Sequence, residues 1–313
     1  MAYTWVPERM RRRLRRRRFV RYYRDLPYNF YMQSQFALRR TLRPVRPDLS
    51  SRERQAFEDV QRHGFTRIEN YWPRQRAVTL GEALERTVSI EEDRTLDCGA
   101  TVKVRFNSRP DGGIRRVYDV EKLHTQLVDV RFDPLPFRIA ASLSGIPFGS
   151  SLLVYQYDSG AGATGGPWHI DTFYSEFKTL LFLKDVDESC GPTAYIPGSH
   201  RLWKLRLKNE FFDYLIGRDV RFFEETVLGK LAKQQTLLCG KAGTLIVFDG
   251  RGLHRSTAQQ GRSRSLLMNY LQVDRPNSAP APGERPPEPL RRRQEVDRSG
   301  RDDPVDSVTC SAS

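Results

Sequence analysis

The stretch that decides the fold is Pro167-Trp168-His169-Ile170-Asp171-Thr172-Phe173. It is short and rich in aromatic residues, and it has the character of the end of a β-strand. Side chains two residues apart in a strand leave the same face, so His169 and Asp171 can approach one metal ion while Ile170 points away. A third ligand then has to come from another strand that lies opposite.

The candidate for that third ligand is His254, which follows the β-like stretch 243–250. Two imidazoles and one carboxylate, with the other coordination positions open, form the facial triad of non-haem Fe(II) oxygenases. Arg264, ten residues after His254, lies at the start of the predicted strand 263–271 and offers a fixed cation for an oxoacid carboxylate. We expect this strand to lie next to the one that bears His254, in a barrel-like fold around one site.

Three further stretches resemble one known family. Residues 190–200, with the sequence Cys-Gly-Pro-Thr-Ala-Tyr-Ile-Pro-Gly-Ser-His, resemble the "GP…PGSH" turn of the phytanoyl-CoA dioxygenase family. Residues 243–249, leading into His254-Arg255-Ser256, resemble the family's metal-ligand strand, and residues 63–71 resemble its opening segment. The resemblance covers residues 51–274, and its elements occur in the family's order.

The resemblance implies a mainly β fold with flanking helices, a double-stranded β-helix (a cupin-like jelly roll) that holds Fe(II) and 2-oxoglutarate and consumes O₂. It implies that His169, Asp171 and His254 are the iron ligands. Arg264 would pair with the distal carboxylate of 2-oxoglutarate, and Ser256, on the same strand face as His254, would contact that carboxylate as well. Related halogenases carry a small residue in place of Asp171, so this carboxylate favours hydroxylation.

Several residues near the expected site allow two interpretations. Tyr155 and Gln156 alternate on the predicted strand 151–158, so one of them points inward toward the oxoacid, and the Gln156 amide is the candidate that we retain. Arg262 competes with Arg264 for the cation role but falls in a predicted turn. Four aromatic residues fit the substrate pocket or the core equally well: Trp168, Phe173, Tyr174 and Trp203.

The histidines also have an ordinary interpretation. His169 and His254 would then be half-buried residues without a metal. The motifs around them in the sequence argue against this alternative. His200, in the "PGSH" turn, is expected to be structural and hydrogen-bonded rather than a ligand.

Hydrophobic periodicity places the elements around the site. Leu80, Leu84 and Val88 recur at the spacing of an amphipathic helix. Helices are predicted at residues 51–62, 74–88, 119–128 and 134–144. Strands are predicted at residues 100–107, 151–158, 177–186, 192–197, 235–239, 243–249, 252–257 and 263–273.

Charge is distributed unevenly along the chain. The formal net charge is +14, of which residues 1–50 contribute +11 and residues 275–313 contribute 0, which leaves +3 for residues 51–274. We therefore predict one dioxygenase domain over 51–274, long enough for a single core. A helical insert at 201–234 is expected to cover its active site. An Arg-rich basic extension (1–50) precedes the domain, and a disordered tail rich in proline and charge (275–313) follows it.

The basic extension has several possible partners. Its arginine run at 11–18 and the aromatic, basic segment 19–24 would suit nucleic acid, an anionic membrane or organelle targeting, or would form a solvated extension without a partner. The sequence contains no run of about 18 apolar residues, so it predicts no transmembrane span. Four cysteines without paired spacing suit a reducing, cytoplasmic location. The oligomeric state is not indicated.

The expected function is that of an Fe(II)- and 2-oxoglutarate-dependent oxygenase that hydroxylates a small organic or lipid-like molecule, with succinate and CO₂ as co-products. Two alternatives stay open. A nucleic-acid-modifying dioxygenase would use the basic extension, although the nearly neutral domain argues against it. A non-catalytic β-helix protein would keep the metal for stability, although the complete ligand set and the oxoacid arginine argue against that. Desaturation and rearrangement are not distinguished from hydroxylation.

Overall fold

The computed structural model describes residues 34, 37–38, 41–42, 49–88, 94–95, 101–106, 113–124, 126–160, 165–171, 176–202, 222–223 and 225–273. Most of the predicted extension 1–50 and all of the predicted tail 275–313 lie outside these residues. No helix among the described residues is long and apolar enough to cross a membrane.

Thirteen strands of the described residues form two antiparallel sheets. The larger sheet contains β1 (Phe65–Ile68), β2 (Arg94–Thr95), β3 (Thr101–Phe106), β4 (Gly113–Tyr118), β5 (Phe148–Asp158), β7 (Glu176–Phe182), β11 (Leu245–Asp249) and β13 (Arg264–Val273). The smaller sheet contains β6 (Trp168–His169), β8 (Thr193–Tyr195), β9 (Phe222–Phe223), β10 (Thr236–Leu238) and β12 (His254–Ser256). Their orders are β1-β11-β7-β13-β5-β4-β3-β2 and β10-β8-β12-β6-β9.

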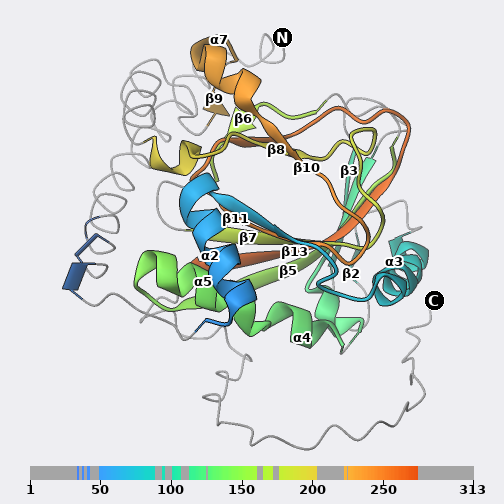
Figure 1. Cartoon of the computed structure of the whole chain (residues 1–313). Coiled ribbons are helices and arrows are strands. Elements are labelled where there is room, and N and C mark those ends of the chain that lie inside the picture. Colours follow the sequence, from blue (N-terminus) through green and yellow to red (C-terminus); the bar gives the residue numbers. More distant parts are fainter. Residues whose placement is uncertain are drawn as a thin grey trace, which may run out of the picture.

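Short helices flank the sheets. The α-helices are α2 (Ser51–His63), α3 (Arg74–Val88), α4 (Leu127–Arg131), α5 (Pro134–Ser144) and α7 (Glu225–Leu228), and the 3-10 helices are η1 (Val120–Lys122), η2 (Ser199–Arg201) and η3 (Gly229–Gln234). Helix α2 begins with a capping box between Ser50 and Glu53 and ends at Gly64, whose φ of 89° suits a residue without a Cβ. The two sheets face each other, with α2, α4 and α5 on the outer side of the larger sheet and α7 beyond the smaller one (Figure 1).

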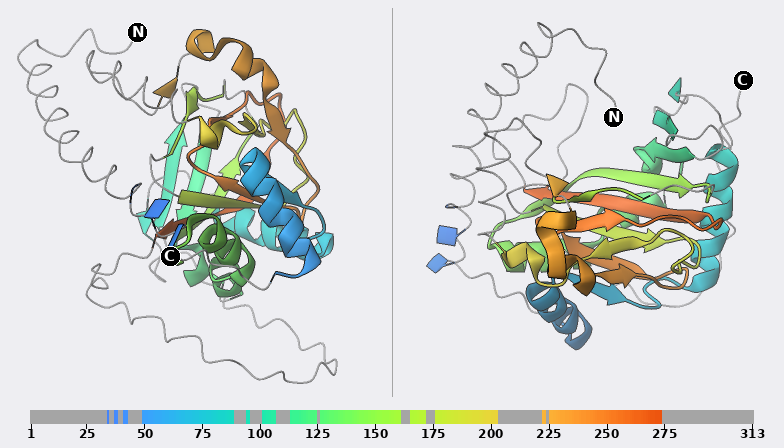
Figure 2. Two further views of the ribbon diagram at one scale, coloured as in Figure 1. Left: turned by 60° about the vertical axis from the view of Figure 1, so that its left-hand side comes forward. Right: turned by 90° about the horizontal axis from the view of Figure 1, so that it is seen from above.

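Strand alternation sorts the apolar side chains into three layers. Leu267 and Leu271 of β13 pack in the cluster between the larger sheet and the helices, whereas Leu266 and Met268 pack in the cluster between the two sheets. A third cluster covers the outer face of the smaller sheet, under α7 and η3. The two views of Figure 2 show the same layers from other sides. The predicted jelly roll with flanking helices is confirmed.

Local predictions mostly agree with these elements, with three differences. The helix predicted at 119–128 is the 3-10 helix η1 followed by α4, and strands β1, β2, β4 and β9 were not predicted. Of the predicted insert 201–234, residues 203–221 and 224 lie outside the described part, and the remainder contains β9, α7 and η3. The third difference concerns Arg264. Its strand, β13, pairs with β5 and β7 in the larger sheet, whereas β12, which bears His254, pairs with β6 and β8 in the smaller one, so the two strands are not neighbours.

Candidate metal centre

The two predicted histidine ligands face each other across neighbouring strands. His169 of β6 and His254 of β12 form a direct antiparallel pair, and their ring centroids lie 4.4 Å apart. Asp171 follows the end of β6, where its backbone N–H donates to the carbonyl of Gly250 at 2.8 Å. One ligand atom from each of these three side chains lies within 4.8 Å of the other two. The structure therefore brings together the three residues that the sequence singled out.

Hydrogen bonds fix the orientation of both imidazoles. Nδ1 of His169 lies 3.0 Å from the carbonyl of Pro167, and Nδ1 of His254 lies 2.9 Å from the carbonyl of Gly252. A carbonyl can only accept, so each Nδ1 donates to it and each Nε2 faces the site. Burial, and next the neighbouring His254, lower the pKa of His169 to about 4. His169 is therefore neutral near pH 7, the form that binds a metal.

Asp171 completes an arrangement that needs a cation. Its Oδ2 atom is buried, accepts no hydrogen bond within the described part of the chain, and lies 3.2 Å from Nε2 of His254. Burial alone would raise the pKa of Asp171, but His254 and the Lys178 ammonium outweigh burial and hold this pKa well below its usual range. An ionised oxygen thus faces Nε2 of His254, and a bound metal ion would satisfy this oxygen.

The other oxygen of Asp171 is held by a lysine that the sequence analysis did not single out. Nζ of Lys178, on β7, donates to Oδ1 of Asp171 at 2.6 Å and lies 4.7 Å from the ring centroid of Tyr270. Burial alone would lower the pKa of Lys178, but the charge of Asp171 outweighs this effect and raises the pKa above its ordinary value. Lys178 is therefore a buried cation beside the metal-ligand cluster.

Arg264 is buried at the start of β13 and already has partners within the protein. Its Nε and Nη2 atoms donate to Oδ2 of Asp158 at 2.9 and 2.5 Å, and its Nη1 atom donates to the carbonyl of Gly191 at 2.6 Å. A guanidinium has five N–H groups, so these bonds leave one N–H on each terminal nitrogen. Arg262, the competing candidate, pairs with Asp187 at the surface.

The structure decides which residue of the Tyr155–Gln156 pair points inward. Tyr155 packs in the cluster beneath the helices, so Gln156 faces the space between the sheets. Its Nε2 atom donates to both oxygens of Asp158 at 3.1 Å. Its Oε1 atom accepts from Nε of Arg116 at 2.8 Å.

Arg116, on the adjacent strand β4, is a second inward-facing cation, which the sequence analysis missed. It pairs directly with Gln156 across the two strands, and neither of its terminal nitrogens has a hydrogen-bond partner in the described part of the chain. The neighbouring residue Val117 lies in the helix-side cluster, which places Arg116 on the opposite, inner face. The inward orientation of Arg116 could have been predicted from the alternation of side chains along β4, but β4 itself was not predicted as a strand.

Ser256 lies two residues after His254 on β12, on the same strand face as that ligand. Its carbonyl accepts from the backbone N–H of Gly166 at 2.9 Å. A Cβ atom at Gly166 would lie 3.2 Å from the Ser256 hydroxyl, so the glycine lets the loop approach this side chain closely.

The structure decides between the two interpretations of Trp168 and excludes it from the predicted substrate pocket. It immediately precedes His169 on β6, so its side chain leaves the opposite face of the sheet, where it packs in the outer cluster with Ile170 and Phe223. Arg255 covers its ring, with the guanidinium carbon 4.5 Å from a ring centroid. Trp168 is thus a core residue and does not line the space beside the metal ligands. The other predicted pocket residues, Phe173, Tyr174 and Trp203, lie outside the described part of the chain.

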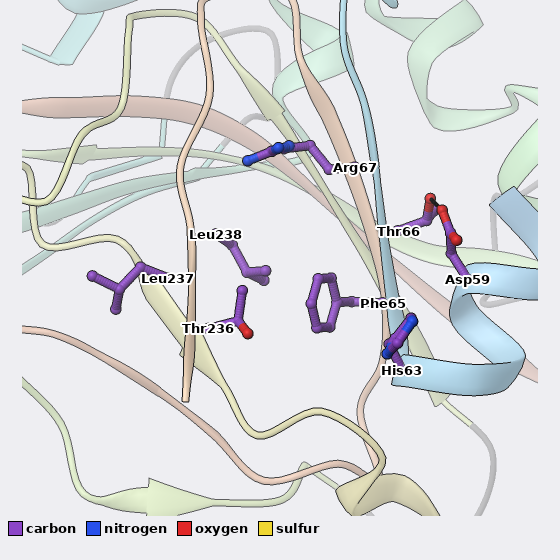
Figure 3. A pocket seen from close by; sticks show the side chains of 8 residues that line it. All are labelled: Asp59, His63, Phe65, Thr66, Arg67, Thr236, Leu237 and Leu238. Carbon is purple, nitrogen blue, oxygen red and sulfur yellow. Dashed lines mark hydrogen bonds between the residues drawn. The ribbon is translucent and has the colours of Figure 1, made fainter. Parts of the chain in front are cut away.

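A shallow pocket of about 290 Å³ lies elsewhere, between the edge strands β1 and β10 (Figure 3). Phe65 and Leu238 form its apolar part, and Thr66 donates to Asp59 at 3.0 Å at its rim. None of the three candidate metal ligands lines it. Its polar pair is already satisfied, so we assign the chemistry to the cluster of His169, Asp171 and His254.

The comparisons with known proteins agree with this assignment. EctD from S. alaskensis in its apoform matches with a TM-score of 0.56 at 19% identity, covering 74% of this chain and 81% of that chain. SnoK, a non-heme alpha ketoglutarate dependent carbocyclase from nogalamycin biosynthesis, matches with a TM-score of 0.53 at 16% identity, covering 72% of this chain and 84% of that chain. At such identities these likenesses show the fold.

The family follows from a match in sequence. No curated protein matches this chain. Residues 60–265 match the model of the phytanoyl-CoA dioxygenase (PhyH) family, and this range contains His169, Asp171, His254 and Arg264. The matched range makes up more than half of the chain. The chain therefore belongs to the phytanoyl-CoA dioxygenase family and is an oxidoreductase of the dioxygenase class.

Proposed function

We propose that this protein is an Fe(II)- and 2-oxoglutarate-dependent oxygenase that hydroxylates a small organic or lipid-like substrate, with O₂ as oxidant and succinate and CO₂ as co-products. The observation that carries the proposal is the convergence of the imidazoles of His169 and His254 with Oδ2 of Asp171, which accepts no hydrogen bond within the described residues. Two imidazoles and one carboxylate on one face suit non-haem Fe(II) and leave positions open for other ligands.

The fold neighbours support this choice of metal and co-substrate. EctD from S. alaskensis has been solved with bound Fe, and separately with 2-oxoglutarate and 5-hydroxyectoine. Bound iron and 2-oxoglutarate would supply the oxidising chemistry, while the protein binds and orients the reactants. The chain's own contribution begins with the carbonyls of Pro167 and Gly252, which hold both imidazoles with Nε2 toward the metal position.

We assign the binding of the oxoacid carboxylate to the two inward-facing cations, Arg264 and Arg116. Arg264 is fixed by Asp158 and Gly191, and it keeps one N–H on each terminal nitrogen for a further acceptor. Because Asp158 cancels the charge of Arg264, a dianionic co-substrate requires additional positive charge. Arg116 supplies it, since Gln156 orients its guanidinium while both terminal nitrogens stay available within the described structure. Ser256 and Gln156 offer neutral hydrogen bonds beside these cations.

Conversion of 2-oxoglutarate to succinate tests the proposal. The purified protein, supplied with Fe(II), 2-oxoglutarate and O₂, should form succinate, and a substrate identified among small organic and lipid-like candidates should accelerate this reaction. Asp171→Ala should abolish succinate formation, whereas Asp187→Ala, which removes a surface carboxylate, should not. Succinate formation that is equal in the wild-type protein and in Asp171→Ala would contradict the proposal.

A further inference from the structure

Lys178 is a buried cation whose place in the protein is fixed from several sides. It lies on β7, in the middle of the larger sheet, directly paired with Phe248 of β11 and Tyr270 of β13. Only 8% of its surface is exposed. The Tyr270 ring lies beneath its ammonium group, and this contact is of the kind that stabilises desolvated cations. Lysines are almost never buried to this extent unless they are paired.

The ammonium group of Lys178 gives the two oxygens of Asp171 different surroundings. Nζ lies 2.6 Å from Oδ1, while Oδ2 accepts no hydrogen bond within the described residues and points at Nε2 of His254 at 3.2 Å. The backbone of Asp171 is fixed as well, because its N–H donates to the Gly250 carbonyl. A Cβ atom at Gly250 would lie 3.0 Å from Oδ2, so the glycine leaves the space that this oxygen needs.

We propose that Lys178 is a positioning residue that restricts Asp171 to binding the metal through Oδ2 alone. This inference rests on the proposed function. Its physical reason is the number of coordination positions: a facial triad leaves three of six positions, and a chelating oxoacid takes two of them. A carboxylate that bound through both oxygens would take a further position and would compete with the co-substrate or O₂. Lys178 prevents this by holding Oδ1 in a short, charge-assisted hydrogen bond.

The proposal predicts a split between metal binding and co-substrate binding. In Lys178→Met, Oδ1 loses its donor, and Asp171 becomes free to chelate the metal through both oxygens. We expect Co(II) to bind this variant at least as tightly as it binds the wild-type protein, because a competing cation has been removed. The affinity of the Co(II)-loaded variant for 2-oxoglutarate should fall about tenfold or more, because the second oxygen of Asp171 then competes for a position that the co-substrate needs, and a tenfold change corresponds to about 1.4 kcal/mol.

The experiment is an anaerobic titration of the full-length protein, first with Co(II) and then with 2-oxoglutarate, followed by the visible absorption of Co(II). The intensity and position of that absorption report coordination number, which a merely structural role of Lys178 would not change. Lys178→Arg keeps a charged donor and should retain co-substrate binding close to that of the wild-type protein. Lys184→Met is the matched control, because it removes a charge just beyond the same strand, where Lys184 pairs with Glu85.

Two results would overturn the proposal. One is that Lys178→Met changes neither affinity, and the other is that it weakens Co(II) and 2-oxoglutarate binding to the same degree. If Lys178→Met does not fold, Lys178→Leu, which also lacks a donor, replaces it, and equal co-substrate affinities in the Leu and Arg variants then count against the proposal. Failure of the proposed function is distinguishable, because the Co(II)-loaded wild-type protein itself would then not bind 2-oxoglutarate.

Discussion

Nε2 of His254 lies 3.2 Å from Oδ2 of Asp171, a buried carboxylate oxygen that accepts no hydrogen bond within the described residues. The hydrogen bond between His254 Nδ1 and the Gly252 carbonyl holds Nε2 toward this oxygen. A buried, ionised oxygen without a hydrogen bond costs free energy until a cation approaches it. The apo-protein is thus prepared for a metal ion at this point.

Metal binding should therefore stabilise the folded protein. At a Mn(II) concentration about 100 times its dissociation constant, we expect about 2.7 kcal/mol of added stability. Thermal unfolding with and without Mn(II) measures this effect. Asp171→Ala should remove it, whereas the surface variant Asp187→Ala should keep it. A metal-induced increase in melting temperature that survives in Asp171→Ala would place the metal elsewhere.

Gly250 should be required for metal binding, because a Cβ atom there would approach Asp171 Oδ2 to 3.0 Å and the Glu176 carbonyl to 3.2 Å. We expect Gly250→Ala to displace the carboxylate and to weaken metal binding about 10–100-fold. Isothermal titration with Mn(II) measures the change. Gly149→Ala is the matched control, since a Cβ atom at Gly149 meets nothing within 4 Å. Equal affinities in the two variants would refute the prediction.

Arg264 should have separable roles in stability and in co-substrate binding. Arg264→Met leaves the buried Asp158 carboxylate without its ion-pair partner, which should cost about 3–5 kcal/mol of unfolding free energy. The double variant Arg264→Met/Asp158→Leu should recover most of that stability, because an apolar pair replaces the ion pair. It should nevertheless bind 2-oxoglutarate far more weakly than the wild-type protein. Urea denaturation and equilibrium binding measure the two quantities, and normal binding by the double variant would exclude Arg264 from the site.

Arg116→Met should lower the affinity for 2-oxoglutarate about tenfold, the effect of losing roughly 1.5 kcal/mol from one charge-assisted hydrogen bond. Metal affinity should stay unchanged, because Arg116 contacts Gln156 and none of the metal ligands. Arg115→Met removes the same charge from the opposite face of β4 and serves as the control. The assignment fails if the two variants bind 2-oxoglutarate equally well.

His200 should make the apo-protein less stable in mild acid. Burial lowers its pKa from the ordinary 6.5 to about 4 in the folded state, so below pH 6.5 the unfolded chain binds a proton that the folded chain does not. The stabilising effect is complete above pH 6.5 and is lost as the pH falls toward 4. Between pH 7 and 5 this amounts to about 2 kcal/mol. His200→Gln should lose that much less stability over the same interval in urea denaturation, and an unchanged pH dependence would contradict the prediction.

Alternation of side chains predicted the long strands and the faces of their residues. Apolar side chains recur along β13 on faces that pack in two different clusters, and those of β5 pack in the cluster beneath the helices. The same rule, applied to the pair Trp168 and His169, would have assigned Trp168 to the outer face. The metal ligands were recognised because their residue types and spacing carry chemistry that does not depend on details of packing.

Other features are decided by long-range pairing, which local pattern does not contain. β4 includes adjacent arginines and lacks a clear apolar alternation, and it is a strand because it pairs with β5. The placement of β13 in a different sheet from β12 follows from chain crossovers. The contact of Lys178 with Asp171 joins β7 to the loop after β6, and no spacing in the sequence predicts such a contact. The role of the basic extension, the disorder of the tail 275–313 and a cytoplasmic location stay predictions.

The most direct test of the central claim is an anaerobic titration of the apo-protein with Fe(II) and 2-oxoglutarate, followed by visible absorption. We predict a weak metal-to-ligand charge-transfer band that requires both additions, disappears in His169→Ala and needs more 2-oxoglutarate in Arg264→Met/Asp158→Leu. The absence of that band from the wild-type protein at saturating Fe(II) and 2-oxoglutarate would contradict the assignment of His169, Asp171 and His254 as the iron site of a 2-oxoglutarate-dependent oxygenase.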